Sequence, residues 1–253
     1  MSTDYHLEDS LERQKLKVFK SAFKHGLKNK NREACGIFVY ENDFQDINFI
    51  PIDNLNHFNK NYFSINNEIF AKYYMNNQVI SLYHTHIDYD ECLSSIDIEI
   101  SESLGLPSFV YSLLSKKFNL FYPISHVPYK LMDRAFIPLF QDCITFVKDY
   151  FFYELNIKLQ TKIKNWSRPR NDYNENLTNI INNNFIELKK ENVKLEKGDI
   201  FLYPPTTHST MHLAVFDGEE KVYHHPVNSY PRKEFLYAGP LEKVYKLYRH
   251  KES

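Results

Sequence analysis

The spacing of apolar residues in the first half of the chain predicts a sheet with helices packed against it. Over residues 9–28, apolar side chains recur at helical spacing, and Gly26 is expected to end that helix. A second helix is predicted over residues 94–104, because Ser94 or Ser95 can cap its start and Gly105 can end it. Short apolar runs predict four strands: residues 35–40, 47–52, 78–83 and 108–114.

The pattern changes near residues 122–132, where Pro123 and Pro128 interrupt it. We therefore expect two domains, residues 1–125 and residues 126–253. The second is expected to open with a helix over residues 143–159 and to contain a solvated loop with a short helix at 165–184. Strands follow from Lys197 on: residues 198–204, 210–216 and 221–227. The expected fold class is α/β and α+β, as a mixed-sheet domain and an α+β domain.

Composition excludes several classes of protein. With 31 basic and 32 acidic residues the net charge is −1, so charge gives no reason to expect nucleic acid or an anionic membrane as a partner. No apolar run approaches the roughly 18 residues of a spanning helix, so we expect no membrane-spanning segment. The N-terminal residues also lack the apolar core of a secretory signal. The odd, low count of 3 cysteines argues against a disulfide framework and leaves room for a reactive thiol.

The end of the third predicted strand carries candidate metal ligands. His84 and His86 point the same way, because strand side chains alternate between faces. Asp97 follows at the start of the second helix, and two imidazoles with one carboxylate suit Zn²⁺ with water in the fourth position. Glu33 precedes the first strand and could face the same pocket as a base. The alternative is two strand-end histidines and a helix acid without a metal.

The full pattern, His-x-His-x₇-Ser-x₂-Asp with an upstream Glu, resembles the JAMM (MPN) family of zinc metallopeptidases. The resemblance implies that Zn²⁺ is bound by three residues: His84, His86 and Asp97. It also implies that Glu33 is the general acid/base and that Ser94 stabilises the oxyanion. The chain departs from many members at Ile87, where they have proline, which changes a loop and no ligand. Cys92 is an alternative ligand that this set does not need.

A second set of residues favours thiol chemistry. Cys143 lies at the first turn of a predicted helix, where the helix N-terminus lowers a thiol pKa. Downstream, His212 and His224 flank a predicted hairpin. A three-residue loop centred on Gly218 would place the two histidines opposite each other, giving a nucleophile, a base and an orienting group. A two-residue loop would instead pair His212 with Tyr223, and His224 would then point away.

These residues, with Asp142 before the cysteine and Gly198-Asp199 before a strand, resemble the NlpC-type cysteine peptidases. That family has a papain-like fold and cleaves peptide bonds in bacterial cell-wall stems, which implies catalytic roles for Cys143, His212 and His224. The departures are Ile144-Thr145 and Ala214, and neither removes a catalytic group. Taken alone, Cys143 would be read as a buried inert cysteine. Two further histidines are expected to be ordinary surface or interface residues: His208 and His225.

The order of the two domains resembles lambda-type phage minor tail proteins, which are tail-tip assembly components with peptidase domains. The resemblance implies other tail-tip proteins and bacterial peptidoglycan as partners. It also implies a place in the virion tail tip, or in an assembly intermediate made in the host cytoplasm, with action at the host envelope. The expected functions are peptidoglycan hydrolysis by the cysteine site and zinc-dependent hydrolysis of another peptide or isopeptide bond. The alternatives are a structural tail subunit with inactive or occluded sites, and a cellular isopeptidase, which the second domain disfavours.

Overall fold

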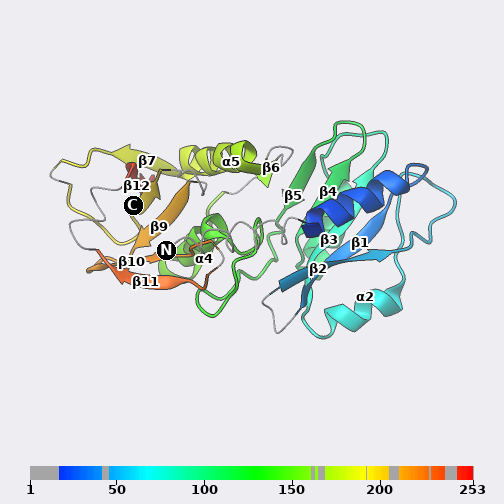
Figure 1. Cartoon of the computed structure of the whole chain (residues 1–253), viewed down its shortest axis with the longest axis horizontal. Helices are drawn as coiled ribbons and strands as arrows, with labels where there is room; N and C mark the ends of the chain where they lie inside the picture. Colours follow the sequence, from blue (N-terminus) through cyan, green and yellow to red (C-terminus); the bar gives the residue numbers. More distant parts are fainter. Residues whose placement is uncertain are drawn as a thin grey trace, which may run out of the picture. The chain divides into compact units, whose positions relative to one another are not determined.

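A computed structural model describes residues 17–41, 46–160, 163–164, 169–191, 193–204, 211–227, 229–236 and 244–252. These residues divide into two compact units (Figure 1). One unit contains the described residues up to Val127 together with those of the Ile163–Asp172 segment. The other contains those from Pro128 to 160 and those from Tyr173 onward. The boundary between the units falls after Val127, two residues beyond the expected boundary at 125/126. The sequence prediction did not include the return of the chain to the first unit at Ile163–Asp172.

The first unit is built on a six-stranded mixed sheet in the order β2-β1-β3-β4-β5-β6. Strands β3 and β4 are parallel and the other neighbours are antiparallel. The strands are β1 (Cys35–Glu41), β2 (Asp46–Ile52), β3 (Val79–His86), β4 (Ser108–Ser112), β5 (Phe118–Phe121) and β6 (Ile163–Lys164). The helices are an N-terminal one over residues 17–28, α2 (Asn67–Tyr74) and α3 (Ser95–Leu104).

Alternating side chains give this sheet two apolar faces. On one face Phe38 and Phe109 pack against Phe19 of the N-terminal helix, with ring centroids 5.3 and 5.9 Å away. On the other face Ile37 and Leu82 belong to a buried cluster that α2 and α3 cover: Ile37, Val39, Ile52, Val79 and Leu82, with Phe70, Tyr73, Ile100 and Leu104. Burial of each such side chain contributes about 1.5–3 kcal/mol to the stability of the folded state. Strand β3, with apolar side chains on both faces, is held in place by this burial.

The second unit has an antiparallel sheet of six strands in the order β11-β10-β9-β8-β12-β7. The strands are β7 (Phe185–Leu188), β8 (Ile200–Tyr203), β9 (His212–Phe216), β10 (Lys221–His224), β11 (Arg232–Phe235) and β12 (Lys246–His250). Helix α4 (Cys143–Leu155) packs against β9 and β10, while α5 (Pro169–Asn184) leads directly into β7. The mixed α/β class expected from the sequence is confirmed for the described residues.

Two helix predictions were wrong for identifiable reasons. The N-terminal helix does not end at Gly26 but continues to residue 28, the end of the predicted range, while residues 9–16 of that range lie outside the described residues. Gly26 lies where this helix approaches β3, since a Cβ there would be 2.7 Å from the Thr85 side chain. The segment at 165–184 contains the 16-residue helix α5 rather than a loop with a short helix. Its buried Leu177, Ile180 and Ile181 form one apolar stripe, and that burial outweighs the polar composition.

Three other elements were not predicted from the spacing of apolar residues: α2, β11 and β6. Helix α2 has only eight residues, none of them fully buried, although Phe70 and Tyr73 pack against the apolar cluster of the sheet. Strand β11 has four exposed residues and shows no alternation of apolar and polar positions. The two-residue strand β6, which the sequence placed in the second domain, pairs with β5 of the first unit. No helix in the described part of the chain is long and apolar enough to cross a membrane.

Gly36 offers a test of this packing. A Cβ at this position of β1 would lie 2.6 Å from the backbone oxygen of Ile50 and 2.7 Å from the Phe49 ring. We expect Gly36→Ala to lower the free energy of unfolding by about 1–3 kcal/mol, because backbone cannot yield as a side chain does. Urea unfolding measures this, with the exposed Ser95→Ala as control. Equal stabilities of the two variants would contradict the packing described here.

Candidate functional site

Strand β3 and helix α3 bring three potential metal ligands together. His84 and His86 lie two residues apart at the end of β3 and therefore share the face that packs against α3. Ser94 is the N-cap of α3 and Asp97 is its third residue. Because α3 connects the parallel strands β3 and β4, its N-terminus lies beside the carboxyl end of β3.

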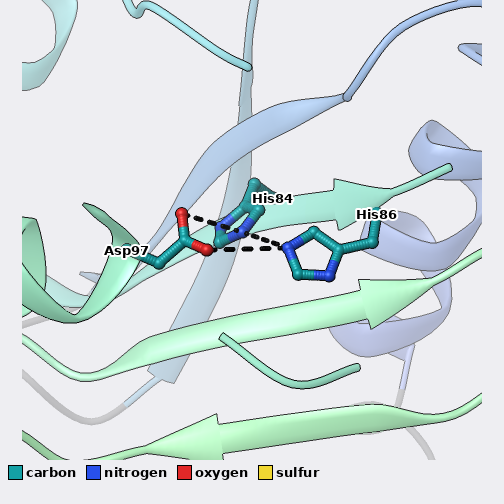
Figure 2. A group of neighbouring side chains, drawn as sticks. All are labelled: His84, His86 and Asp97. Atoms are coloured by element: carbon teal, nitrogen blue, oxygen red, sulfur yellow. Dashed lines mark hydrogen bonds and ion pairs between the residues drawn. The ribbon is translucent and has the colours of Figure 1, made fainter. Parts of the chain in front are cut away.

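The three side chains converge on one point (Figure 2). The Nε2 atoms of His84 and His86 are 3.2 Å apart. The Asp97 carboxylate lies 3.4 Å from Nε2 of His84 and 3.6 Å from Nε2 of His86. Tetrahedral ligands at about 2.0–2.1 Å from a Zn²⁺ ion are about 3.3 Å apart, so the spacing fits a tetrahedral ion. All three residues are buried, and they form a group that could bind a metal.

Neighbouring groups orient the three ligands. Nδ1 of His86 lies 2.7 Å from the backbone oxygen of Asp90, so it donates there and leaves the Nε2 lone pair for a cation. The backbone N–H and hydroxyl of Ser94 both donate to Oδ2 of Asp97, at 2.8 and 2.7 Å. The His84 ring stacks on Phe63 with centroids 4.8 Å apart. Each ligand is thus held by a contact outside the triangle of donor atoms.

The electrostatics of the group suit a cation. Burial raises the pKa of Asp97, but hydrogen bonds from His84 and His86 outweigh it and hold this pKa well below its usual range. Burial lowers the pKa of His84. For His86, burial lowers the pKa, yet its bonds to Asp97 and Asp90 raise it overall. Metal binding competes with protonation of the histidine ligands, so affinity should fall as the pH is lowered.

Glu33 and Ser94 share a cavity of about 540 Å³ with His86 and Asp97. The other lining residues are Asn59, Asn61, Tyr62, Phe63, Tyr89, Asp90, Cys92, Ile96 and Ile100. Glu33 is 4% exposed and lies just before β1. Its backbone oxygen accepts a bond from Asn54, and its backbone N–H donates to the oxygen of Lys60, at 2.9 Å each. These bonds hold Glu33 at the edge of the cavity.

Burial raises the pKa of Glu33 to about 8, although the nearby His86 opposes this and Asp97 reinforces it. The carboxyl group is therefore neutral at the start of a reaction near pH 7 unless a cation lies beside it. A carboxyl group whose pKa lies near the operating pH can both accept and release a proton. A pKa of about 8 therefore suits the role of general acid/base that was expected for Glu33 from the sequence.

Two other residues of the first unit fall close to the ligands. Ser94 lines the cavity, and its hydroxyl serves as the N-cap of α3 while donating to Asp97. Cys92 also lines the cavity, but it is not part of the convergent group found among the described residues. Asn54 was not singled out by sequence reasoning. Its side chain makes four bonds, to Glu33, Asn56, Tyr62 and Ser64, which no local pattern reveals.

In the second unit, Cys143 is the first residue of α4 and is buried. Asp142 caps the helix: its Oδ1 accepts from the backbone N–H groups of Ile144 and Thr145 at 3.0 and 2.9 Å. The Thr145 hydroxyl accepts in return from the Asp142 N–H at 2.8 Å. Thr145, a departure from the family pattern, therefore completes a capping box. The box fixes the first turn that carries the cysteine.

The hairpin register differs from both registers considered for the sequence. His224 pairs with Ala214, so His212 lies two residues away from the position directly opposite. The physical reason is Asp217, whose Oδ1 accepts from the backbone N–H groups of Glu219 and Lys221 and so holds a longer loop. A shift of two residues keeps both histidines on one face, since side chains alternate with period two. His212 Nε2 lies 2.9 Å from His224 Nδ1.

Helix α4 directs its first turn toward the histidine end of the sheet. The Phe146 ring is 6.1 Å from the ring of His225, whereas the Tyr150 hydroxyl reaches the backbone oxygen of Phe216 at the opposite end of β9. Tyr150 also contacts Tyr223, which shows that α4 packs on the odd-numbered face of β10. By alternation, His212 and His224 point to the other face of the sheet. The described contacts therefore bring the two histidines to each other but not to Cys143, and a contact between the thiol and His212 stays a prediction.

Burial leaves both histidines of the second unit neutral at pH 7. Burial, with His224 nearby, lowers the pKa of His212 to about 3. Burial also lowers the pKa of His224, although Glu234 opposes this. A general base works best with a pKa near the operating pH, so this environment disfavours the imidazolium that His212 would form on accepting a proton.

His225 is not the surface or interface histidine expected from the sequence. It is fully buried, with its ring 5.2 Å from that of Phe136, and its Nε2 lies 3.0 Å from the backbone oxygen of Ser229. It follows His224 directly, so it faces the α4 side of the sheet. His208 lies outside the described residues. Asp199, from the Gly-Asp pair, is buried and forms two 2.8 Å bonds with Arg249.

Comparisons with known proteins add little to this geometry. No family model matches the chain, and a search of curated proteins finds no match. Among solved structures, the chain is similar to protein DSY2949 from Desulfitobacterium hafniense, with 20% identity and a TM-score of 0.33. That alignment covers 42% of this chain and 81% of the other.

The raised pKa of Glu33 gives a prediction for the metal-free protein. Between about pH 4.5 and pH 8 the folded state holds a proton that the unfolded state has released, so stability falls as pH rises through this window. Glu33→Gln removes the titration, and its stability relative to the wild type should increase from pH 5 to pH 8. Urea unfolding in the presence of a chelator measures this. The exposed Glu68→Gln is the control, and a pH-independent difference for Glu33→Gln would contradict the assignment.

Proposed function

We propose that the first unit is a zinc-dependent peptidase. The convergence of His84, His86 and Asp97, with Glu33 in the same cavity, carries this proposal. Three protein ligands leave a tetrahedral ion one open position, which distinguishes a catalytic zinc site from a structural one. Zinc is preferred over other divalent ions because two imidazoles and one carboxylate, at tetrahedral spacing, match its ordinary ligand set.

Bound zinc would lower the pKa of water and polarise a peptide carbonyl. In the proposed mechanism His84, His86 and Asp97 would hold the ion. Glu33 accepts the proton of the attacking water on its carboxylate and returns it to the leaving amine nitrogen. The Ser94 hydroxyl donates to Asp97, and rotation toward the cavity would let it donate to the oxyanion instead.

We also propose a thiol peptidase in the second unit. The 2.9 Å contact between His212 and His224 supports it, because a base needs a partner that orients its ring. Cys143 at a capped helix N-terminus supports it as well, since that position favours a thiolate. In this proposal Cys143 is the nucleophile, His212 the base and His224 the orienting group. It requires the thiol at the start of α4 to reach His212, whose side chain points to the other face of the sheet.

Together these sites lead us to propose a phage tail-tip protein that hydrolyses peptidoglycan through its cysteine site and another peptide or isopeptide through its zinc site. Its partners would be other tail-tip proteins and bacterial peptidoglycan. The burial of Cys143 favours a second candidate, a tail-assembly subunit whose cysteine site is closed until a neighbour opens it. The zinc site with its open cavity is the more direct basis for enzymatic activity.

Metal analysis tests the first site. We expect about one Zn²⁺ per chain, lost when His84 and His86 are both replaced by alanine, because one carboxylate alone binds zinc weakly. His57→Ala is a matched control, since His57 is an exposed histidine of the same unit. Glu33→Gln should keep the zinc and lose about 10²–10⁴-fold of any peptidase activity. Retention of zinc by the double variant would exclude this ligand set.

Digestion of purified peptidoglycan, with mass analysis of the fragments, tests the second site. We expect Cys143→Ala to abolish cleavage and Glu33→Gln to leave it unchanged. Cys92→Ala is the control for the thiol, because Cys92 is an exposed cysteine of the other unit. Cleavage that survives Cys143→Ala but is lost in Glu33→Gln would assign wall hydrolysis to the metal site. No cleavage by folded, zinc-loaded wild type would favour the assembly subunit.

A further inference from the structure

A glutamate outside the proposed catalytic groups lies in line with the two histidines. His224 on β10 pairs with Ala214 on β9 and with Arg232 on β11. His212 lies two residues before Ala214, and Glu234 lies two residues after Arg232. Because residues two apart share a face, His212, His224 and Glu234 form a diagonal across three neighbouring strands.

The distances connect these three side chains in series. Nε2 of His212 is 2.9 Å from Nδ1 of His224, and Nε2 of His224 is 3.4 Å from Oε1 of Glu234. Each ring nitrogen of His224 thus faces one partner. The second separation is longer than an ordinary hydrogen bond, and within the described part of the chain Nε2 of His224 makes no hydrogen bond of standard geometry. Beside a carboxylate, an N–H at this position is still electrostatically favoured over a lone pair.

The chemistry of a neutral imidazole then sets both tautomers. A carboxylate only accepts, so Glu234 favours the proton of His224 on Nε2. Nδ1 of His224 is left as an acceptor and takes its hydrogen bond from an Nε2–H of His212. Nδ1 of His212 consequently carries a lone pair. The order of donors and acceptors is determined at the Glu234 end of the line.

We propose that Glu234 is a positioning residue that fixes His224 and His212 as Nε2–H tautomers and leaves Nδ1 of His212 as the basic atom. The tautomers follow from the contacts alone. Their consequence for catalysis rests on the thiol peptidase proposed above.

The surroundings are consistent with a neutral relay. Arg232 is the other charged group on this face of β11, and its Nη1 lies 4.0 Å from Glu234 while its Nη2 donates to the Ser229 hydroxyl at 3.0 Å. On the β8 side the ring of Tyr203 is 6.1 Å from that of His212. Burial lowers the pKa of both histidines, for His224 against the opposing effect of Glu234, so each ring carries a single proton at pH 7.

Nitrogen-15 NMR of the imidazole rings in the full chain at pH 7 tests the proposal. We expect both His212 and His224 as Nε2–H tautomers in the wild type. In Glu234→Ala we expect the Nδ1–H tautomer of His224 to appear, with a matching change at His212. Glu187→Ala is the control: Glu187 has the same 52% side-chain exposure on the same sheet and pairs with Lys246 at 2.7 Å. It should change neither ring.

An Nδ1–H tautomer of His224 in the wild type would overturn the proposal, as would unchanged rings in Glu234→Ala. As a second measurement, alkylation of Cys143 near neutral pH should slow by about tenfold in Glu234→Ala, the effect of losing one oriented hydrogen bond. An unchanged alkylation rate would overturn the positioning role. If the tautomers are as expected while Cys143→Ala leaves peptidoglycan hydrolysis intact, the thiol peptidase fails and the tautomer assignment stands.

Discussion

Two imidazoles and a carboxylate meet in the buried interior of the first unit, and their close approach is the constraint on which its functional account depends. Uncompensated polar groups in an apolar interior are costly. Here Asp97 contacts both His84 and His86, Asp90 accepts from His86, and Ser94 donates to Asp97, while Nδ1 of His84 has no hydrogen-bond partner among the described residues. The sheet and α3 are placed so that these groups face one another, at the spacing a tetrahedral cation needs.

The position of the group follows from ordinary sheet and helix rules. Strand β3 is buried along its length and lies between β1 and β4, so its end is held rigidly. The crossover helix α3 starts at the carboxyl end of β3, and its capping box brings Asp97 to the histidines. Asp97 is both the third residue of the capping box and a candidate metal ligand. Helix stability and site geometry are therefore coupled at Asp97.

Much of this site could be predicted because its determinants are local. Alternation places His84 and His86 on one face, and the spacing from Ser94 to Asp97 is that of a helix cap. Other features depend on contacts between distant segments. Asn54 reaches Glu33 across 21 residues, and the line from His212 to Glu234 requires the β10–β11 pairing. The apolar pattern of the exposed strand β11 contains no sign of that pairing.

The length of the β9–β10 turn could not be predicted either, although the residues that determine it are close in sequence. The turn was identified from Asp217-Gly218, but its length depends on how the Asp217 side chain binds Glu219 and Lys221. His212 and His224 still share a face, as predicted, because a shift of two residues equals the alternation period of strand side chains. The fold of α5 was missed since burial of Leu177, Ile180 and Ile181 depends on what packs over them.

X-ray absorption spectroscopy of the zinc-loaded protein tests the central claim most directly. The account predicts four nitrogen or oxygen ligands at about 2.0–2.1 Å, including two imidazoles, and no sulfur. A sulfur ligand at about 2.3 Å would bring Cys92 into the site in place of a proposed ligand and would contradict the assignment of an open catalytic position.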